Sequence, residues 1–131
     1  MRHFFRGLAS LLVLASPAQA NARSNLEGRW KNGRMEILIR PCGGTLCGTV
    51  VKASEKQQAR AQRGSGTNLL GARVIDNIQP TGGGSYKADV YLADRDMSAS
   101  GTIRQVNPNR LNVRGCVFAF LCKTTNWDRV R

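Results

Sequence analysis

Apolar and polar residues alternate with a period of two in several short stretches of the chain. Residues 35–40, 86–92 and 111–114 each show this alternation. Successive side chains of a strand point to opposite faces, so this pattern predicts strands with one buried face and one wet face. Residues 46–51 and 125–130 are read as two further strands.

Turn signals separate these stretches. Gly43-Gly44, Gly82-Gly83-Gly84 and Asn107-Pro108-Asn109 are typical of tight connections between antiparallel neighbours. About eight short strands with such connections predict an all-β fold, a small meandering antiparallel barrel. A barrel of this size has an interior that is either filled by side chains or holds one small ligand, and the pattern leaves both open.

One polar segment interrupts the strands. Ser54 and Gln57 have the spacing of a capping box, and residues 59–62 are good helix formers. No apolar stripe accompanies them, so we expect a short exposed helix or a mobile loop that ends at Gly64-Ser65-Gly66.

The first 20 residues have the features of a cleavable export signal. Arg2, His3 and Arg6 give a positive start, residues 8–15 are apolar, and Ala18-Gln19-Ala20 fits a cleavage site. We therefore predict a signal peptide over residues 1–20, a single β-barrel domain over 21–131, and a periplasmic or secreted protein. No later segment approaches the roughly 20 apolar residues of a transmembrane helix.

Removal of this segment takes away His3, the only histidine of the chain. Histidine is the usual general base near neutral pH and the commonest metal ligand. Ser-His and Cys-His nucleophile pairs and histidine-ligated metal sites are thereby excluded from the mature chain. We expect no catalytic residue, no cofactor and no enzymatic activity.

The remaining chain carries 18 basic and 8 acidic residues, a net charge of +10. Such a surface attracts anions such as acidic lipids and polymers, although the charges are spread out and also serve solubility. Only six aromatic residues remain, and they do not interleave with basic residues as a base-stacking platform would. We expect no specific nucleic-acid binding.

Four cysteines form two short brackets, Cys42 with Cys47 and Cys116 with Cys122. Exported proteins meet an oxidising compartment, where paired thiols form disulfides. Zinc ribbons space each pair by two to four residues, whereas four and five residues separate the cysteines here. We predict disulfides between sequence neighbours, one of the three connectivities that four cysteines allow.

Asp94, Asp96, Ser98 and Ser100 alternate in a way that would direct oxygens at one cation. A calcium loop of the EF-hand type needs glycine at its sixth position and glutamate at its twelfth. Ala99 and Gln105 stand there. We interpret the aspartates as solvated turn residues and predict no metal site.

Three residues are candidates for a ligand site: Trp30, Arg114 and Trp127. Aromatic side chains dominate small-molecule pockets, although both tryptophans also suit the core of so small a domain. Arg114 falls on the face opposite Leu111 and Val113. If those two point inward, Arg114 is exposed; in the reverse orientation it is a buried cation that needs an anion.

Several motifs resemble a known bacterial family. They are Gly28-Arg29-Trp30, Ile37-Leu38-Ile39-Arg40-Pro41-Cys42-Gly43, Leu46-Cys47-Gly48-Thr49-Val50-Val51, Leu111-Asn112-Val113-Arg114-Gly115-Cys116 and Trp127-Asp128-Arg129-Val130. Together they are similar to the domain of unknown function family 2147. The resemblance covers almost the whole mature chain and implies a small exported protein with a lipocalin-like barrel. The family has no established activity, so it supplies no catalytic residue.

Two functions remain as expectations. The first is a non-enzymatic barrel that binds a small hydrophobic or anionic amphiphile. The second is an envelope protein with a filled barrel that binds anionic lipid or polymer through its basic exterior. Nothing in the sequence indicates an oligomeric state.

Overall fold

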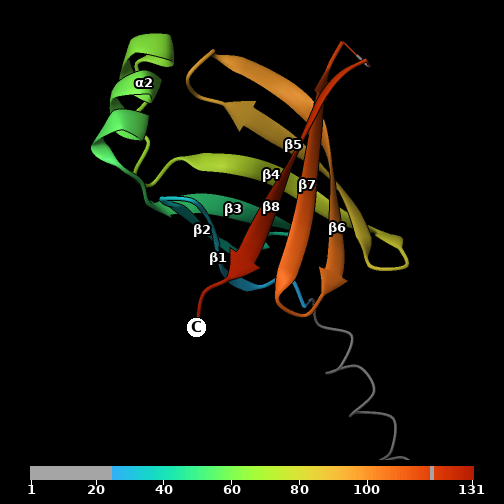
Figure 1. Cartoon of the computed structure of the whole chain (residues 1–131). Coiled ribbons are helices and arrows are strands. Elements are labelled where there is room, and N and C mark those ends of the chain that lie inside the picture. The colour runs from blue at the N-terminus through green and yellow to red at the C-terminus, as the bar shows by residue number, and fades with distance from the viewer. Residues whose placement is uncertain (1–24, 119) are drawn as a thin grey trace, which may run out of the picture.

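Eight antiparallel strands close into a barrel in the computed structural model, which describes residues 25–118 and 120–131 (Figure 1). The strands are β1 (Gly28–Asn32), β2 (Met35–Cys42), β3 (Thr45–Lys52), β4 (Arg73–Gly82), β5 (Ser85–Leu92), β6 (Met97–Asn107), β7 (Arg110–Val117) and β8 (Leu121–Arg129). Helix α2 (Glu55–Ser65) lies between β3 and β4. The predicted signal segment over residues 1–20 lies outside the described residues.

Every strand pairs with its sequence neighbour, and β8 returns to pair with β1. The closing contact joins Trp30 to Arg129 and Lys31 to Asp128 in register. The expectation of a small antiparallel barrel of about eight strands is therefore confirmed. The structure adds that β6 begins at Met97, so the alternating Ser98 and Ser100 belong to a strand and not to a loop.

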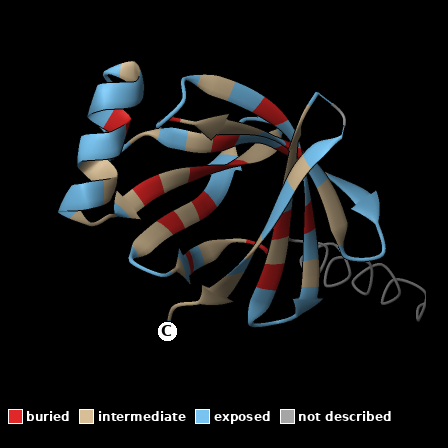
Figure 2. Ribbon diagram, turned by 45° about the horizontal axis from the view of Figure 1, so that its top comes forward, coloured by how far each residue is buried: buried red, intermediate tan, exposed pale blue. Residues whose placement is uncertain are grey.

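The barrel interior holds the hydrophobic core. Figure 2 shows buried bands that alternate along the strands with more exposed ones, as a period of two requires. The largest fully buried side chains are Trp30, Leu26, Ile37, Ile39, Ile78, Ile103, Leu111, Val50 and Cys47. No charged or polar residue is fully buried within the described ranges.

The antiparallel order defines two ends of the barrel. We call one the helix end; it carries α2, the β5–β6 turn and the β7–β8 turn (Figure 1). We call the other the terminal end, since β1 begins there and β8 finishes there (Figure 1). The two ends differ in what closes them.

Helix α2 has defined caps at both ends. Ser54 and Gln57 form the predicted capping box, and Gly66 ends the helix in the left-handed conformation. The Ser65 hydroxyl donates to the Ala93 carbonyl at 2.7 Å, which ties the last turn to the β5–β6 turn. The polar segment is thus a helix, one of the two predicted alternatives. Neither α2 nor any other helix in the described part of the chain is long and apolar enough to cross a membrane.

The cysteines pair as sequence neighbours. Cys42 bonds to Cys47 across the β2–β3 hairpin, and Cys116 bonds to Cys122 across the β7–β8 hairpin. The first disulfide lies at the terminal end and the second at the helix end, because consecutive antiparallel hairpins alternate between the two ends. Each therefore closes a strand connection at the rim of the barrel.

Candidate functional site

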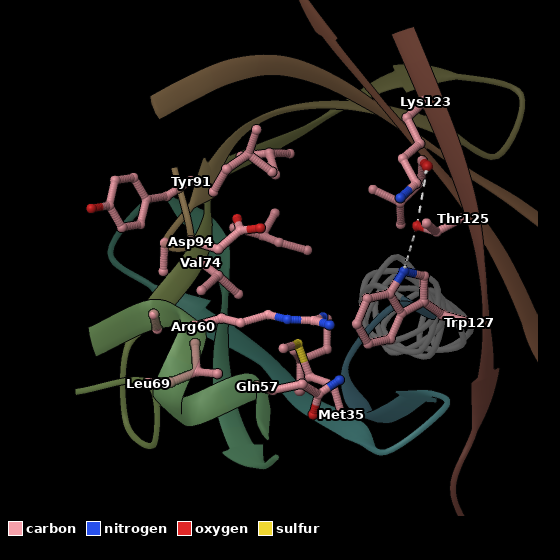
Figure 3. Close-up of a pocket in the computed structure, with 17 residues that line it drawn as sticks. Met35, Gln57, Arg60, Leu69, Val74, Tyr91, Asp94, Lys123, Thr125 and Trp127 are labelled. Carbon is pink, nitrogen blue, oxygen red and sulfur yellow. Dashed lines mark hydrogen bonds between the residues drawn. The ribbon is translucent and has the colours of Figure 1, made fainter. Parts of the chain in front are cut away.

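A cavity of about 380 Å³ opens into the barrel at its helix end (Figure 3). Its wall comes from α2 and from strands on both sides of the barrel. The lining residues are Met35, Ile37, Gln57, Arg60, Ala61, Leu69, Val74, Ile75, Val90, Tyr91, Leu92, Ala93, Asp94, Val113, Lys123, Thr125 and Trp127. The interior is therefore partly hollow, which answers the question that the strand pattern left open.

Most of the cavity wall is apolar. Met35 and Ile37 stand two apart on β2, and Val113 lies on β7, so the inward positions of the alternation supply them. Helix α2 adds Ala61, which is buried although no apolar stripe surrounds it. Leu69 follows the helix and is also buried. A wall of this kind suits a hydrocarbon chain, because little in it needs a hydrogen bond from the ligand.

Three charged side chains stand in this wall, each from a different element (Figure 3). Arg60 extends from α2 across the cavity toward Trp127, and Lys123 comes from β8 on the same side as Thr125 and Trp127 (Figure 3). Asp94 also lines the cavity, and its carboxylate lies 4.0 Å from Arg95 Nε. Two cations against one partly neutralised anion give the cavity a net positive character, which favours an anionic group in the ligand.

Trp127 is held in place by a short hydrogen-bond chain. Its indole Nε1 donates to Thr125 Oγ1 at 3.0 Å, and Thr125 Oγ1 donates to the Val113 carbonyl at 3.4 Å (Figure 3). The ring is half-buried and faces the cavity. Because its polar atom already has a partner, the indole presents mainly its apolar surface to a ligand.

The three candidate residues from the sequence occupy different places. Trp127 lines the cavity. Trp30 is fully buried in the core, where its Nε1 donates to the Leu26 carbonyl at 2.8 Å, and it is not among the lining residues. Arg114 is exposed, and it lies in register with Thr102 of β6 and Thr124 of β8. Leu111 and Val113 are buried, so Arg114 points outward, the first of the two orientations considered.

Arg60, Lys123 and Gln57 line the cavity but are not among the three candidate residues from the sequence. Lys123, Thr125 and Trp127 share one face of β8 because they are two apart, so the choice of Trp127 already contained a signal for Lys123. Arg60 and Gln57 had no such signal. Their place in the cavity depends on how α2 packs across the barrel, which is a tertiary contact.

The side chains around the cavity are mainly apolar, cationic and aromatic. No group of three or more histidine, cysteine, aspartate or glutamate residues within 25–118 and 120–131 is arranged to hold a metal ion. At Asp96, the carboxylate accepts a hydrogen bond from the Tyr91 hydroxyl at 2.7 Å. What the cavity offers is apolar surface, two cationic groups and an indole.

Comparison with known proteins places this geometry in context. A search among curated proteins gives no significant match. Among solved structures, the chain is similar to protein HP1028 from Helicobacter pylori, which is described as belonging to the lipocalin family. The TM-score is 0.61 at 12% sequence identity, and the match covers 81% of this chain and 83% of that chain. At this identity the likeness concerns the fold, a lipocalin-like barrel.

A family model agrees with the motifs quoted from the sequence. It is described as "Uncharacterized protein conserved in bacteria (DUF2147)" and matches residues 28–129, from the first residue of β1 to the last of β8. The match thus spans the complete barrel, including all the strands that line the cavity. The chain belongs to this family of uncharacterized bacterial proteins, DUF2147.

Proposed function

We propose that the protein is a non-enzymatic carrier or sensor that binds one small anionic amphiphile in the cavity at the helix end. The observation that carries this proposal is the combination of an apolar cavity of about 380 Å³ with Arg60 and Lys123 in its wall. Small-molecule sites typically enclose about 300–1,000 Å³ and combine apolar lining with a few polar groups. Barrels of eight strands, lipocalins among them, have room for one such ligand.

The ligand's apolar chain packs between Ile37, Val113 and Trp127, where the wall is hydrophobic. Its head group lies between the Arg60 guanidinium and the Lys123 ammonium, whose side chains enter the cavity from α2 and β8. Hydrogen bonds between ionised partners are shorter and stronger than neutral ones. A carboxylate, sulfate or phosphate monoester matches this pair better than a neutral or cationic head group does.

The protein works outside the cytoplasm, in the periplasm or after secretion. Its two disulfides support this location, since they persist in oxidising compartments. The lipocalin-like fold, which usually serves binding, supports a role without catalysis. Transport or buffering of an amphiphile between envelope surfaces fits both the location outside the cytoplasm and the role without catalysis.

Titration with dodecanoate tests the proposal, with the emission of Trp127 as the signal. We expect saturable binding that shifts the emission, and loss of that shift in Trp127→Phe, because Trp30 is fully buried away from the cavity. The double variant R60Q/K123Q is expected to bind dodecanoate at least about tenfold more weakly, the loss of one or two charge-assisted hydrogen bonds. Its affinity for neutral dodecanol is expected to stay the same.

The matched control is R63Q/K87Q, which removes one arginine of the same helix and one lysine of β5. Both residues are exposed, and neither lines the cavity. An equal loss of dodecanoate affinity in both double variants would reduce the effect to general surface charge and overturn the proposed site. Absence of saturable binding by the unaltered protein would overturn the function itself.

A further inference from the structure

The β7–β8 turn carries the most exposed large apolar side chains of the described chain. Phe118 is 71% exposed, Phe120 is 81% exposed and Leu121 is 57% exposed. We call these three residues the apolar tip. Exposed aromatic side chains of this size are costly in water, and a contiguous group of them marks an interaction site.

The backbone of the tip is constrained by a disulfide and a tight turn. The Cys116–Cys122 disulfide joins the two strands directly below it, and the Phe120 amide donates to the Phe118 carbonyl at 2.6 Å. Phe118 has a φ of +57°, a left-handed conformation that a bulky residue rarely adopts. The turn is therefore built so that apolar side chains remain on the outside, although a small flexible residue would fit it better.

The arms below the tip carry two cations. Arg114 of β7 and Lys123 of β8 are both exposed and stand within two residues of the disulfide, Arg114 on the outer face of the hairpin and Lys123 on the face toward the cavity. The sequence contains no acidic residue between Asp96 and Asp128, so no carboxylate on either arm offsets these charges. The hairpin thus combines the apolar tip with two cations below it, Arg114 and Lys123, which we call the positive collar. Peripheral proteins bind anionic membranes through this combination of apolar and cationic groups.

The tip lies beside the cavity. Both belong to the helix end of the barrel, and Lys123, one residue after Cys122, lines the cavity. A surface bound by the tip would face the helix end of the barrel, where the cavity opens and an amphiphile would enter. The apolar surface also continues beside the hairpin, where Met97, Val117 and Phe118 border a second hollow.

We infer that the apolar tip docks the barrel on an anionic phospholipid bilayer, with Phe118, Phe120 and Leu121 in the interfacial region and Arg114 and Lys123 against the head groups. A protruding turn with a positive collar fits a yielding, negatively charged surface better than it fits a rigid protein groove. Docking itself does not require the cavity; its purpose, exchange of the amphiphile with the membrane, rests on the proposed function.

Vesicle flotation tests the inference. The full mature protein is mixed with vesicles of phosphatidylglycerol and phosphatidylethanolamine, and separately with phosphatidylcholine vesicles. We expect binding to the anionic vesicles, and a loss of at least about tenfold in F118N/F120N, because two aromatic side chains no longer enter the interface. Asparagine is chosen because it tolerates the left-handed conformation at position 118.

Val106→Asn is the control for the tip variant, since Val106 is 45% exposed on β6 near the terminal end. It is expected to bind vesicles like the unaltered protein. For the collar, R114Q/K123Q is compared with R104Q/K87Q. The second pair removes one exposed arginine and one exposed lysine nearer the terminal end of the barrel. We expect a loss of about tenfold in the first pair only, from roughly 1 kcal/mol per cation near an anionic surface.

Insertion is measured by placing a tryptophan at the tip. Bromine on the lipid acyl chains is expected to quench the added emission of Phe120→Trp but not that of Val106→Trp, both read against the same native tryptophans. Equal quenching of both, or vesicle binding that F118N/F120N retains, would overturn the inference. So would a tip-dependent dimer in sedimentation without lipid, because a second copy would then cover the tip.

Lys123 belongs to both proposals, so two variants that leave it intact separate them. F118N/F120N is expected to keep its affinity for dodecanoate in solution, since Phe118 and Phe120 do not line the cavity. R60Q is expected to keep its affinity for vesicles, whereas its affinity for dodecanoate is expected to fall. Loss of vesicle binding in R60Q equal to that in R114Q/K123Q would assign the docking to overall charge and overturn the role of the tip.

Discussion

The Arg129 guanidinium lies 4.2 Å from the centroid of the Trp30 ring and closes the terminal end of the barrel. Its Nε donates to the Pro108 carbonyl at 3.0 Å, while its two terminal nitrogens donate to the carbonyls of Glu27 at 3.0 Å and Asn25 at 2.6 Å. One side chain from the last strand thus joins the residues before β1 to the β6–β7 turn. The fully buried Trp30 beneath it is shielded from water at this end, whereas the helix end stays hollow.

Arg129→Ala is expected to lower the free energy of unfolding by roughly 2–4 kcal/mol, because it removes a cation–π contact and several hydrogen bonds from a charged donor. Arg129→Lys is expected to recover only part of the loss, since an ammonium cannot reproduce the planar fork. Urea unfolding followed by tryptophan emission measures both. Arg131→Ala is the control, and equal midpoints for Arg129→Ala and the unaltered protein would contradict the role of this contact.

Gly28→Ala is expected to destabilise the barrel by roughly 1–3 kcal/mol, because alanine adopts the backbone conformation of position 28 only with strain and its Cβ would push the Arg129 guanidinium aside. Gly28 has a φ of +131°, and an added Cβ would lie 2.7 Å from an Arg129 nitrogen. Gly44→Ala in the β2–β3 turn is the control, because a Cβ there has open space and no positive φ opposes it. Thermal unfolding distinguishes them: the melting temperature should fall for Gly28→Ala and stay near that of the unaltered protein for Gly44→Ala.

Alternation within single strands was enough to predict the barrel. Residues 35–40, 86–92 and 111–114 lie in β2, β5 and β7, and the predicted glycine turns separate β2 from β3 and β4 from β5. Strands β1, β4 and β6 were not predicted individually. In β6, serine and alanine at 98–100 carry little hydrophobic contrast. There the partner strands, and not the local sequence, determine the structure.

The cavity was harder to predict than the barrel. Whether an eight-stranded barrel is hollow depends on whether side chains from opposite walls reach one another. The alternation along a single strand does not indicate the distance between those side chains. Trp127 was named from its residue type and lines the cavity; Trp30, named for the same reason, is part of the core. Arg60 enters the site only through the packing of α2, a contact between segments that are far apart in the sequence.

Asp94→Asn is expected to increase the affinity for dodecanoate by about two- to threefold, because it removes the carboxylate that opposes Arg60 and Lys123 in the cavity wall. The increase should shrink at high salt, as expected for a partly exposed charge. Calorimetric titration measures it, with Asp96→Asn as the control, since Asp96 does not line the cavity. Weaker binding by Asp94→Asn would mean that Asp94 helps to position the cations.

Gly64→Ala is expected to loosen α2 from the barrel. Alanine favours a helix over glycine by about 1 kcal/mol, but an added Cβ would collide with the backbone of Asp94, and overpacking of this kind costs roughly 1–3 kcal/mol. The collision involves backbone that cannot rotate away, so the packing term should outweigh the helix term. Ser65 would then lose its hydrogen bond to the Ala93 carbonyl as well.

Limited trypsin treatment checks this displacement, since α2 contains Lys56, Arg60 and Arg63. These sites are expected to be the first cut in the unaltered protein and to be cut faster in Gly64→Ala, because a cleavable site must leave the helix to enter the protease. Dodecanoate should slow cleavage at Arg60 in the unaltered protein and have a smaller effect in the variant. Gly44→Ala, in an open turn at the other end, shares the substitution without the contact and without a positive φ. Equal cleavage rates for all three proteins would show that α2 does not depend on the close approach of Gly64 to Asp94.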